Sequence, residues 1–320
     1  MTILIAVTGW EAGPWVRRFQ ELAPDRRILE TGIDGAFAGN PADLEAVCYV
    51  LAWKPRPALL ASLANLQVLF SLGAGVDHIL GLPALPDVPI ARIVDPDLTT
   101  RMSEYIAWQV LHHHRQGFAH ARLQADRRWQ ELRQPAAGDL TVGIMGLGVL
   151  GRDAAEVLCR LGFHVIGWSR TEKTIDGLDT YHGKTGLELF LGQSDILVSL
   201  LPLTPATTGL INRSLISRLK RDGPLGGSVL INAGRGGSQV DADIAAALAD
   251  GTLVGASLDV FEDEPLAPDS PLWSLTNLVI TPHVAAVSSP KALARNIIDQ
   301  IKTYESGQPL QNLVDPARGY

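Results

Sequence analysis

The sequence predicts an α/β fold with two Rossmann-like or flavodoxin-like domains, each built on a parallel sheet. Three observations predict it. The length of 320 residues corresponds to about two domains. Apolar strand patterns alternate with helical patterns along the chain. A glycine-rich turn that starts at Gly146 follows a strand pattern and precedes a helical one, so the half of the chain before it needs a fold of its own.

In the first hundred residues, proline and glycine separate strand patterns at 3–7, 46–51, 67–70 and 90–93, as in a small parallel sheet with helical connections. A loop at 134–138 precedes the second half of the chain. Between these parts, a helical periodicity runs from 99 to about 123 and includes Met102, Tyr105, Ile106, Gln109, Val110 and His113.

The turn reads Gly146-Leu-Gly-Val-Leu-Gly151, with strand patterns at 140–145 and 163–168 and a helical pattern at 153–161 between them. The first glycine allows the tight turn, the second lets the backbone approach a pyrophosphate, and the third lets helix and strand pack closely. The helix N-terminus then faces the anion. The unit predicts a nicotinamide or flavin dinucleotide site, and a plain glycine turn is the alternative.

The alternation resumes after this unit. Its last helical pattern follows the final strand of the second half, so we expect this helix to return to the first domain. The strand candidates are 195–200, 228–232, 253–260 and 278–281, and the helix candidates are 186–191, 213–219, 241–250 and 290–306.

Charge and composition exclude several classes of protein. The net charge of −7 argues against nucleic acid or an anionic membrane as a partner. No apolar run reaches the roughly 18 residues of a membrane-spanning helix. The N-terminal segment has a strand pattern and lacks the basic region of a signal peptide. Two cysteines, Cys48 and Cys159, indicate buried free thiols in a reducing cytoplasm.

The segment after the second strand of the dinucleotide unit indicates the cofactor. It reads Trp168-Ser-Arg-Thr-Glu-Lys173 and has no carboxylate at 168–170, where an NAD enzyme places the one that binds the ribose 2′-hydroxyl. Ser169, Arg170 and Lys173 are suited to a 2′-phosphate. We therefore expect NADP(H) rather than NAD(H). The alternative is that the two cations belong to a solvated loop, and Glu172 would partly neutralise them.

Three polar residues follow strand candidates of the second half: Arg235, Glu264 and His283. Ligands of open α/β sheets bind at these strand ends. Hydride transfer to a 2-keto acid needs a cation for the carboxylate and carbonyl, an imidazole to deliver a proton, and a carboxylate to orient the imidazole. Each residue alone has an ordinary structural explanation, but the set behind a dinucleotide fold predicts an active site.

With these residues in place, the chain resembles the D-isomer-specific 2-hydroxyacid dehydrogenases, in order over its whole length. The resemblance implies a discontinuous substrate-binding domain (1–101 plus 287–320), an inserted NADP-binding domain (102–286) and an active site in the cleft between them. It is carried by the glycine turn, Asn232-Ala-Gly-Arg-Gly236, Leu258-Asp-Val-Phe261 with Glu264-Pro-Leu266, and Thr281-Pro-His283.

The resemblance also implies roles for single residues. Arg235 binds the substrate, His283 is the acid/base paired with Glu264, and Asp259 lies near the nicotinamide carboxamide. Residues 201–204 form a loop under the adenine side. The implied cofactor-binding set is Met102, Gly146, Leu147, Gly148, Val149, Leu150, Gly151, Ser169, Arg170, Lys173, Leu201, Pro202, Thr207, Ala233, Arg235, Asp259 and His283.

The substrate carboxylate has a second candidate partner in Leu72-Gly-Ala-Gly-Val-Asp77, which follows a strand pattern. Its two glycines favour an anion-binding nest of backbone N–H groups, and a structural turn is the alternative. The resemblance makes the amides of Ala74 and Gly75 the carboxylate binders. The implied substrate-binding set is Trp53, Gly73, Ala74, Gly75, Arg235 and His283.

Within the family, the chain is most similar to the branch of glyoxylate/hydroxypyruvate reductases, through Trp53-Lys-Pro55, residues 168–171 and the C-terminal segment 314–320. This implies NADPH-dependent reduction of glyoxylate to glycolate and of hydroxypyruvate to D-glycerate by a homodimer. Trp53 would wall the pocket for small acids, although a core aromatic is an equal alternative. Trp129 resembles a tryptophan that reaches the partner subunit's active site.

Two other functions remain open at this point: an NAD-linked enzyme for a bulkier or phosphorylated acid, and a dinucleotide-sensing binding protein with the same fold. A metal site at the run His112-His-His114 is not expected, because consecutive helical residues point about 100° apart and do not converge on one ion. The expected chemistry needs no metal.

Overall fold

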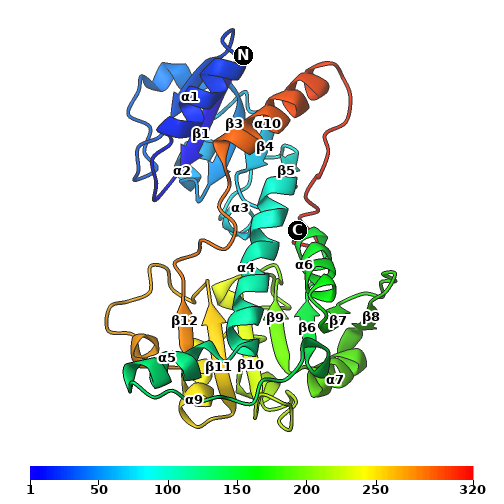
Figure 1. Cartoon of the computed structure of the whole chain (residues 1–320). Coiled ribbons are helices and arrows are strands. Elements are labelled where there is room, and N and C mark those ends of the chain that lie inside the picture. Colours follow the sequence, from blue (N-terminus) through cyan, green and yellow to red (C-terminus); the bar gives the residue numbers. More distant parts are fainter. Residues whose placement is uncertain (320) are drawn as a thin grey trace. The chain divides into compact units, whose positions relative to one another are not determined.

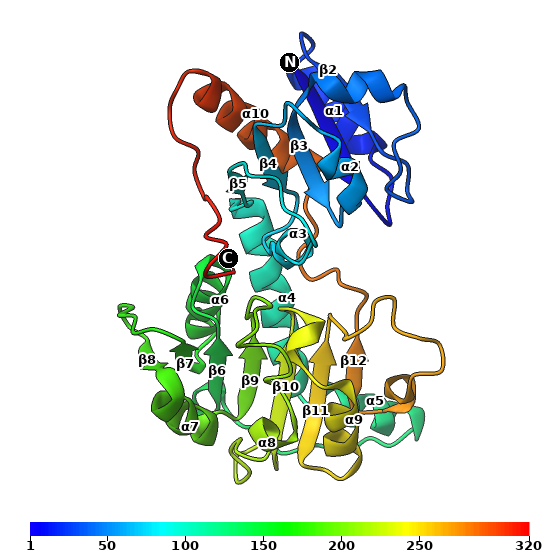
Figure 2. The same ribbon diagram turned by 180° about the vertical axis from the view of Figure 1, so that it is seen from behind.

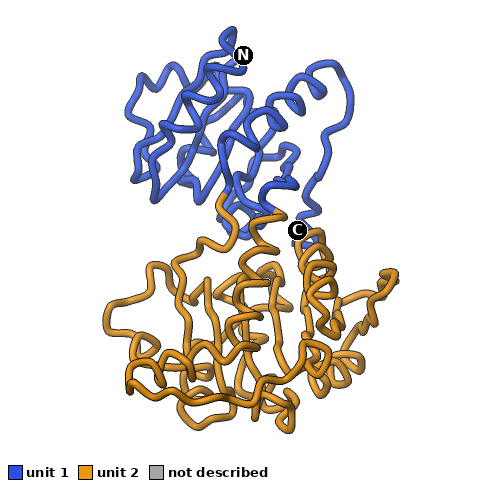
Figure 3. The backbone as a smooth tube through the Cα atoms, in the orientation of Figure 1, with its two compact units in different colours: residues 1–98, 288–320 blue, residues 99–287 orange. Residues whose placement is uncertain are grey.

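The structure, a computed structural model, describes residues 1–319. It divides into two compact units (Figure 3). Unit 1 consists of Met1–Leu98 together with the C-terminal segment from Ser288, and unit 2 consists of Thr99–Val287. Because the chain leaves unit 1 and later returns to it, unit 2 is an insertion within unit 1.

Unit 1 is built on a parallel sheet with the strand order β2-β1-β3-β4-β5 (Figure 1). Alternate residues of β1 enter two different buried clusters: Ile5 lies with helices α1 and α10, and Leu4 lies with α2 and α3. The sheet is therefore covered on both faces. Its elements are β1 (Thr2–Val7), α1 (Gly13–Leu22), β2 (Arg27–Glu30), η1 (Pro41–Ala46), β3 (Val47–Trp53), α2 (Pro57–Ala61), β4 (Val68–Ser71), α3 (Asp77–Leu80), β5 (Ile90–Ala91) and α10 (Pro290–Glu305).

Unit 2 contains a second parallel sheet, whose order β12-β11-β10-β9-β6-β7-β8 can be followed in Figure 2. The chain order reverses between β6 and β9, which is where open α/β sheets bind their ligands. The elements are α4 (Pro96–His114), α5 (Gly117–Ala125), η2 (Ala137–Asp139), β6 (Thr141–Met145), α6 (Val149–Arg160), β7 (His164–Ser169), β8 (Asp179–His182), α7 (Gly183–Gln193), β9 (Ile196–Ser199), α8 (Arg213–Ile216), β10 (Ser228–Asn232), η3 (Gly236–Ser238), α9 (Asp241–Ala249), β11 (Leu253–Leu258), η4 (Pro271–Ser274) and β12 (Leu278–Ile280).

The strands of unit 2 also alternate between two buried clusters. Met145 and Leu230 pack with α7, α8 and α9, whereas Ile144 and Ile231 pack with α4 and α6. Figures 1 and 2 show α4 against the sheet face opposite to α9. The predicted fold of two parallel-sheet α/β domains is confirmed.

Some element boundaries differ from the prediction. The helical pattern over 99–123 is interrupted at Gln116, whose φ of 56° is left-handed, so α4 ends at His114 and a second helix, α5, follows. The sequence did not predict β2 and β8, because both lie at sheet edges with exposed or half-buried residues and lack the apolar run of a central strand. The pattern over 213–219 yields a shorter helix, α8.

The expectation of two buried thiols is wrong for Cys159. Cys48 is half-buried in β3, but Cys159 is exposed on α6. The buried face of α6 carries Ala154, Ala155 and Leu158, and the next residue is turned by about 100° from Leu158 toward the outside.

Within the described residues, none of the helices is both long enough and apolar enough to cross a membrane. Tyr320, the last residue of the C-terminal segment that contributes to the resemblance, lies outside the described residues.

Candidate active site

The three glycines of the turn after β6 have different surroundings. Gly146 has a φ of 106°, and a Cβ atom there would lie 2.8 Å from the carbonyl oxygen of Leu200. A Cβ on Gly151 would lie 2.1 Å from the carbonyl oxygen of Gly146. At Gly148, the N-cap of α6, a Cβ would meet no atom within 4 Å. The outer two glycines are thus needed for packing, and the middle one leaves open space for a phosphate to approach the helix N-terminus.

Two cations lie beside this turn. Nζ of Lys173 donates a 2.8 Å hydrogen bond to the carbonyl oxygen of Leu147, and Nε of Arg152 donates to the same oxygen at 3.3 Å. Burial, and secondarily the positive charge of Arg152, lower the pKa of Lys173. Such a pair suits an anionic ligand. Arg152 was not among the expected site residues, although its position directly after Gly151 in the sequence was a usable signal.

The end of β7 carries the other residues expected at the 2′-phosphate. Ser169 is buried, and its hydroxyl donates a 2.7 Å hydrogen bond to the carbonyl oxygen of Thr171. Arg170 is exposed. Because the Ser169 hydroxyl already donates within the loop, its proton is not available to a ligand in this conformation. The positive charge of the segment comes from Arg170 and Lys173.

Neighbouring loops close around the glycine turn. The hydroxyl of Thr207 donates to the carbonyl oxygen of Pro202 at 2.7 Å, which shapes the loop after β9. A Cβ on Gly234 would lie 2.8 Å from the carbonyl oxygen of Leu201, so the loop after β10 packs directly on it. The apolar floor of this region is one buried cluster that contains Met102, Leu147, Ala233 and Ala285, with Leu150 half-buried against it.

Arg235 is half-buried in a turn that is fixed by the Asn232 side chain before it and by the close packing of Gly236 after it. Its Nη1 donates to the carbonyl oxygen of Gly234 at 2.8 Å. The Asn232 side chain accepts from the Gly234 N–H at 3.0 Å and donates to Gln239 at 2.7 Å. At Gly236, a Cβ would lie 1.8 Å from the carbonyl oxygen of Phe261, so only glycine allows the chain to pass there. The guanidinium is therefore carried by a rigid turn.

His283 and Glu264 form a pair. Nδ1 of His283 lies 3.1 and 2.9 Å from the two carboxylate oxygens of Glu264, and the two side chains are 31% and 23% exposed. His283 has a left-handed φ of 55°, and its N–H donates to the carbonyl oxygen of Asp259 at 2.8 Å. Because Glu264 engages Nδ1, the pair is suited to move a proton through Nε2.

Asp259, at the end of β11, organises the segment that carries His283. Its carboxylate accepts from the hydroxyl of Thr281 at 2.6 Å and from the N–H groups of Val284 and Ala285 at 2.9 Å each. The side chain is buried, and this burial raises the pKa of Asp259. Asp259, which is expected near the nicotinamide carboxamide, thus also holds the loop after β12 by hydrogen bonds.

In unit 1, the expected substrate-binding residues lie together. The Ser71 hydroxyl is within hydrogen-bond distance of the carbonyl oxygens of Gly73 and Gly75, at 2.9 and 3.1 Å. Because a trans peptide points N–H and C=O in opposite directions, the N–H of Ala74 points away from buried Ser71. A Cβ on Gly73 would lie 2.6 Å from the Trp53 ring, so this glycine lets the half-buried indole pack over the loop.

The histidine run contributes to packing. His113 is buried on α4, with Nε2 2.8 Å from the hydroxyl of Ser257 on β11, and burial lowers the pKa of His113 to about 3. Within residues 1–319, no group of three or more His, Cys, Asp or Glu side chains is arranged to hold a metal ion.

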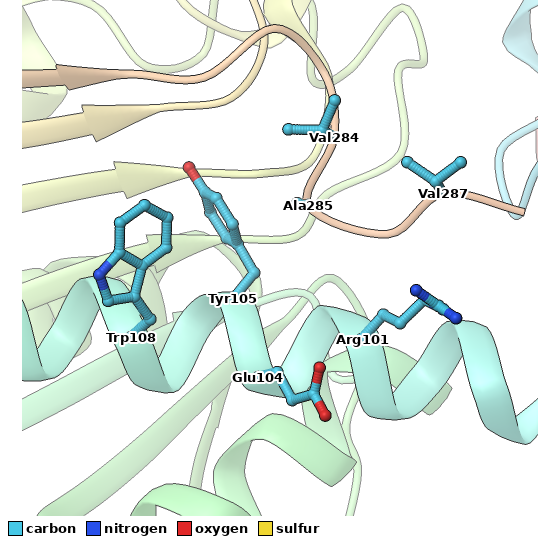
Figure 4. Close-up of a pocket in the computed structure, with 7 residues that line it drawn as sticks. All are labelled: Arg101, Glu104, Tyr105, Trp108, Val284, Ala285 and Val287. Atoms are coloured by element: carbon cyan, nitrogen blue, oxygen red, sulfur yellow. The ribbon is translucent and has the colours of Figure 1, made fainter.

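A surface pocket of unit 2 lies beside α4 (Figure 4). One side of it is lined by residues of α4, and the other side by residues of the loop after His283. It does not contain Arg235, Glu264 or His283. The lining residues are Arg101, Glu104, Tyr105, Trp108, Val284, Ala285 and Val287.

The fold and the site define a dinucleotide-binding α/β protein with a hydrogen-bonded histidine–glutamate pair after two of its strands. Residues 107–285 match the family model described as D-isomer specific 2-hydroxyacid dehydrogenase, NAD binding domain. Glyoxylate/hydroxypyruvate reductase A of Salmonella newport is 38% identical over 100% of both chains. The chain belongs to the D-isomer-specific 2-hydroxyacid dehydrogenase family, which confirms the resemblance.

Solved structures give the same result. An NADPH-dependent glyoxylate/hydroxypyruvate reductase from Sinorhizobium meliloti, in complex with NADP and sulfate, is 48% identical with a TM-score of 0.92, covering 100% of this chain and 99% of that one. A probable 2-hydroxyacid dehydrogenase from Rhizobium etli, in complex with NADP, HEPES and L(+)-tartaric acid, is 49% identical with a TM-score of 0.91 over the same shares.

Proposed function

We propose that this protein is an NADPH-dependent reductase that converts glyoxylate to glycolate and hydroxypyruvate to D-glycerate. The observation that carries the proposal is the contact between Nδ1 of His283 and the Glu264 carboxylate, at 2.9 Å. This pair, Arg235 and the glycine turn all follow strands of the same parallel sheet. Relatives that carry this activity in their names match the chain over its full length.

The cofactor is held by the glycine turn and the strand ends around it. The open space at Gly148 fits a pyrophosphate at the N-terminus of α6. Arg170 and Lys173, joined by Arg152, bind the 2′-phosphate of NADP(H). The complexes of similar proteins with NADP support this assignment. Unit 2 is accordingly the cofactor-binding domain and unit 1 the substrate-binding domain.

The nicotinamide supplies a hydride for the carbonyl carbon of the keto acid when it is bound. His283 delivers a proton from Nε2 to the carbonyl oxygen, so the carbonyl becomes a hydroxyl group. Glu264 keeps the imidazole ring in place, and Arg235 holds the substrate carboxylate and polarises the carbonyl. In unit 1, the amides of Ala74 and Gly75 are the groups suited to bind a substrate carboxylate.

Trp53 provides selectivity for small acids. Its ring packs over Gly73 and lies 4.8 Å from the ring of His78, centroid to centroid. An indole fixed in this way limits the space next to the carboxylate-binding loop, which disfavours bulky 2-keto acids.

A kinetic panel tests this function. NADPH and NADH are each combined with glyoxylate, hydroxypyruvate and phenylpyruvate, and kcat/KM is measured for all six pairs. We expect the two small acids with NADPH to give the highest values. A preference for NADH would contradict the role of Arg170, and a preference for phenylpyruvate would contradict the role of Trp53. NADPH binding without turnover of any acid would indicate a sensing protein instead.

A homodimer is part of the proposal. Large apolar side chains are exposed on unit 2: Trp108 is 52% exposed, Val287 is 54% exposed, and both line the pocket of Figure 4. Trp129 is fully exposed in the segment after α5. Apolar side chains that gather in this way favour a protein partner, and a second copy of the chain is the partner we propose. Trp129 would then reach the partner's site.

The cytoplasm is the proposed location. The cysteines Cys48 and Cys159 are unpaired within the described residues, and the second is exposed. An exposed thiol persists in a reducing compartment.

A further inference from the structure

Two partly buried hydrogen bonds in series connect α4 with the loop that carries His283, and the number of hydroxyl protons fixes their direction. The hydroxyl of Thr281 gives its single proton to the carboxylate of Asp259, at 2.6 Å. Its oxygen lies 2.8 Å from the hydroxyl of Tyr105. Since Thr281 has no second proton to give, Tyr105 is the donor of this bond. The chain therefore runs from Tyr105 through Thr281 to Asp259.

The same counting applies one helical turn further along α4. Ser257 gives its proton to Oε1 of Gln109 at 2.7 Å, so Nε2 of His113 donates to Ser257. The side chains of Gln109 and Ser257 are completely buried. Gln109 follows Tyr105 by four residues, so both lie on one face of the helix. The face of α4 next to the sheet thus carries a fixed row of polar groups.

Asp259, the last residue of this hydrogen-bonded series, holds the backbone around His283. Asp259 holds the N–H groups of Val284 and Ala285 with its carboxylate and the N–H of His283 with its carbonyl oxygen. His283 has a φ of 55°, a conformation that costs energy for a residue with a Cβ and persists only where neighbouring contacts enforce it. Asp259 supplies such contacts on both sides of the Cα atom of His283.

We infer that Tyr105 is a positioning residue for the reaction proposed above: through Thr281 it fixes Asp259, and through Asp259 it fixes the backbone that presents His283. Figure 4 shows the Tyr105 side chain rising from α4 toward the strands, with Val284 and Ala285 on the loop beyond. Tyr105 is 7% exposed and is not required to touch substrate or cofactor in this role. The inference rests on the proposed function, because His283 matters only if it moves a proton.

The first test is kinetic. Tyr105→Phe removes the hydroxyl and keeps the ring, so we expect kcat to fall about tenfold, as for a misplaced catalytic group, with KM for the keto acid and Kd for NADPH changed less than about twofold. Thr281→Val should give a similar loss, and Thr281→Ser, which keeps the hydroxyl, should recover most of the activity. The double variant Tyr105→Phe/Thr281→Val should have nearly the same kcat as Thr281→Val alone, since both substitutions interrupt the same series of hydrogen bonds.

Tyr49→Phe is the matched control. Tyr49 is also a buried tyrosine, and its hydroxyl lies 3.2 Å from the Glu305 carboxylate in unit 1. Losing this hydroxyl removes a partly buried hydrogen bond, as Tyr105→Phe does, and leaves the hydrogen bonds to Asp259 intact. If Tyr49→Phe lowers kcat as much as Tyr105→Phe does, the loss reflects general destabilisation and the inference is overturned.

The second test does not depend on turnover. Amide hydrogen exchange of the segment 281–287, measured without substrate, should be faster in Tyr105→Phe than in the wild type and unchanged in Tyr49→Phe. Unchanged exchange in Tyr105→Phe overturns the positioning role, and so does faster exchange with undiminished kcat. A wild-type protein that reduces none of the keto acids refutes the proposed function, and the exchange measurement keeps the two failures apart.

Discussion

His283 shows how one residue is placed by several different interactions. Its ring is oriented by Glu264, and its backbone is held by Asp259 in a left-handed conformation. A general acid needs both constraints, because proton transfer depends on the distance and direction of one nitrogen atom. At the scale of single residues, the proposed general acid His283 is thus distinct from Glu264 and Asp259, which hold it in place.

Replacement of His283 tests its role directly. His283→Ala should lower kcat by at least about two orders of magnitude, the usual contribution of a general acid, while NADPH still binds. Rapid-mixing kinetics and cofactor fluorescence measure the two quantities. His120→Ala, at an exposed position of α5, is the control and should behave as the wild type does. Turnover of His283→Ala close to the wild-type rate would show that another group delivers the proton.

Residue chemistry explains why some site candidates could be found in the sequence and others could not. Arg235, Glu264 and His283 are ionisable groups that follow apolar strand patterns, and this is visible without coordinates. Thr281 and Ser257 are hydroxyl residues in strand-forming segments, and nothing in the sequence indicates their partners. Their hydrogen bonds join positions 148 and 176 residues away, as Ser257 to Gln109 and Thr281 to Tyr105 show.

At the scale of elements, α4 is the clearest case of a helix that does two things. The helical spacing of Met102, Tyr105, Gln109 and His113 predicts that they share a face. The structure shows that this face is only partly apolar: Met102 enters the core, whereas Gln109 and His113 hydrogen-bond with the sheet through Ser257. Periodicity alone identifies the buried face but not the polar contacts on it.

The burial of His113 makes stability depend on pH. Burial lowers the pKa of His113 to about 3 in the native state, so the unfolded chain takes up a proton that the native chain does not. The free energy of unfolding therefore falls as pH decreases from about 6.5, the ordinary histidine value, toward 3. Between pH 7.5 and 5.5 this residue should account for a loss of about 1 kcal/mol.

Urea unfolding at the two pH values, for the wild type and for His113→Gln, measures this contribution. The variant should lose less stability than the wild type on acidification, because glutamine does not titrate. His120→Gln removes an exposed histidine and should keep the wild-type difference. If the wild type and His113→Gln lose equal free energy of unfolding on acidification, His113 takes up its proton in the native state as readily as in the unfolded chain, which contradicts the prediction.

At the scale of the whole molecule, the proposed homodimer makes a separate prediction. Sedimentation equilibrium should give twice the chain mass of 34.4 kDa. Trp108→Glu replaces an exposed apolar side chain of the pocket in unit 2 by a charge and should shift the protein toward the monomer. Trp273→Glu, at a tryptophan that is equally exposed, is the control and should leave the dimer intact. A monomeric wild type would contradict the proposal.

The sequence by itself determined the fold class, the glycine turn and the family. These depend on local patterns: apolar periodicity, glycines at fixed spacing, and ionisable residues after strands. Only the tertiary structure decided the edge strands β2 and β8, the exposure of Cys159, the contact of Arg152 with the Leu147 carbonyl oxygen, and the hydrogen bonds that link Tyr105 to Asp259. The physical reason is that exposure and hydrogen-bond partners depend on which distant segments meet, and a linear pattern does not contain that information.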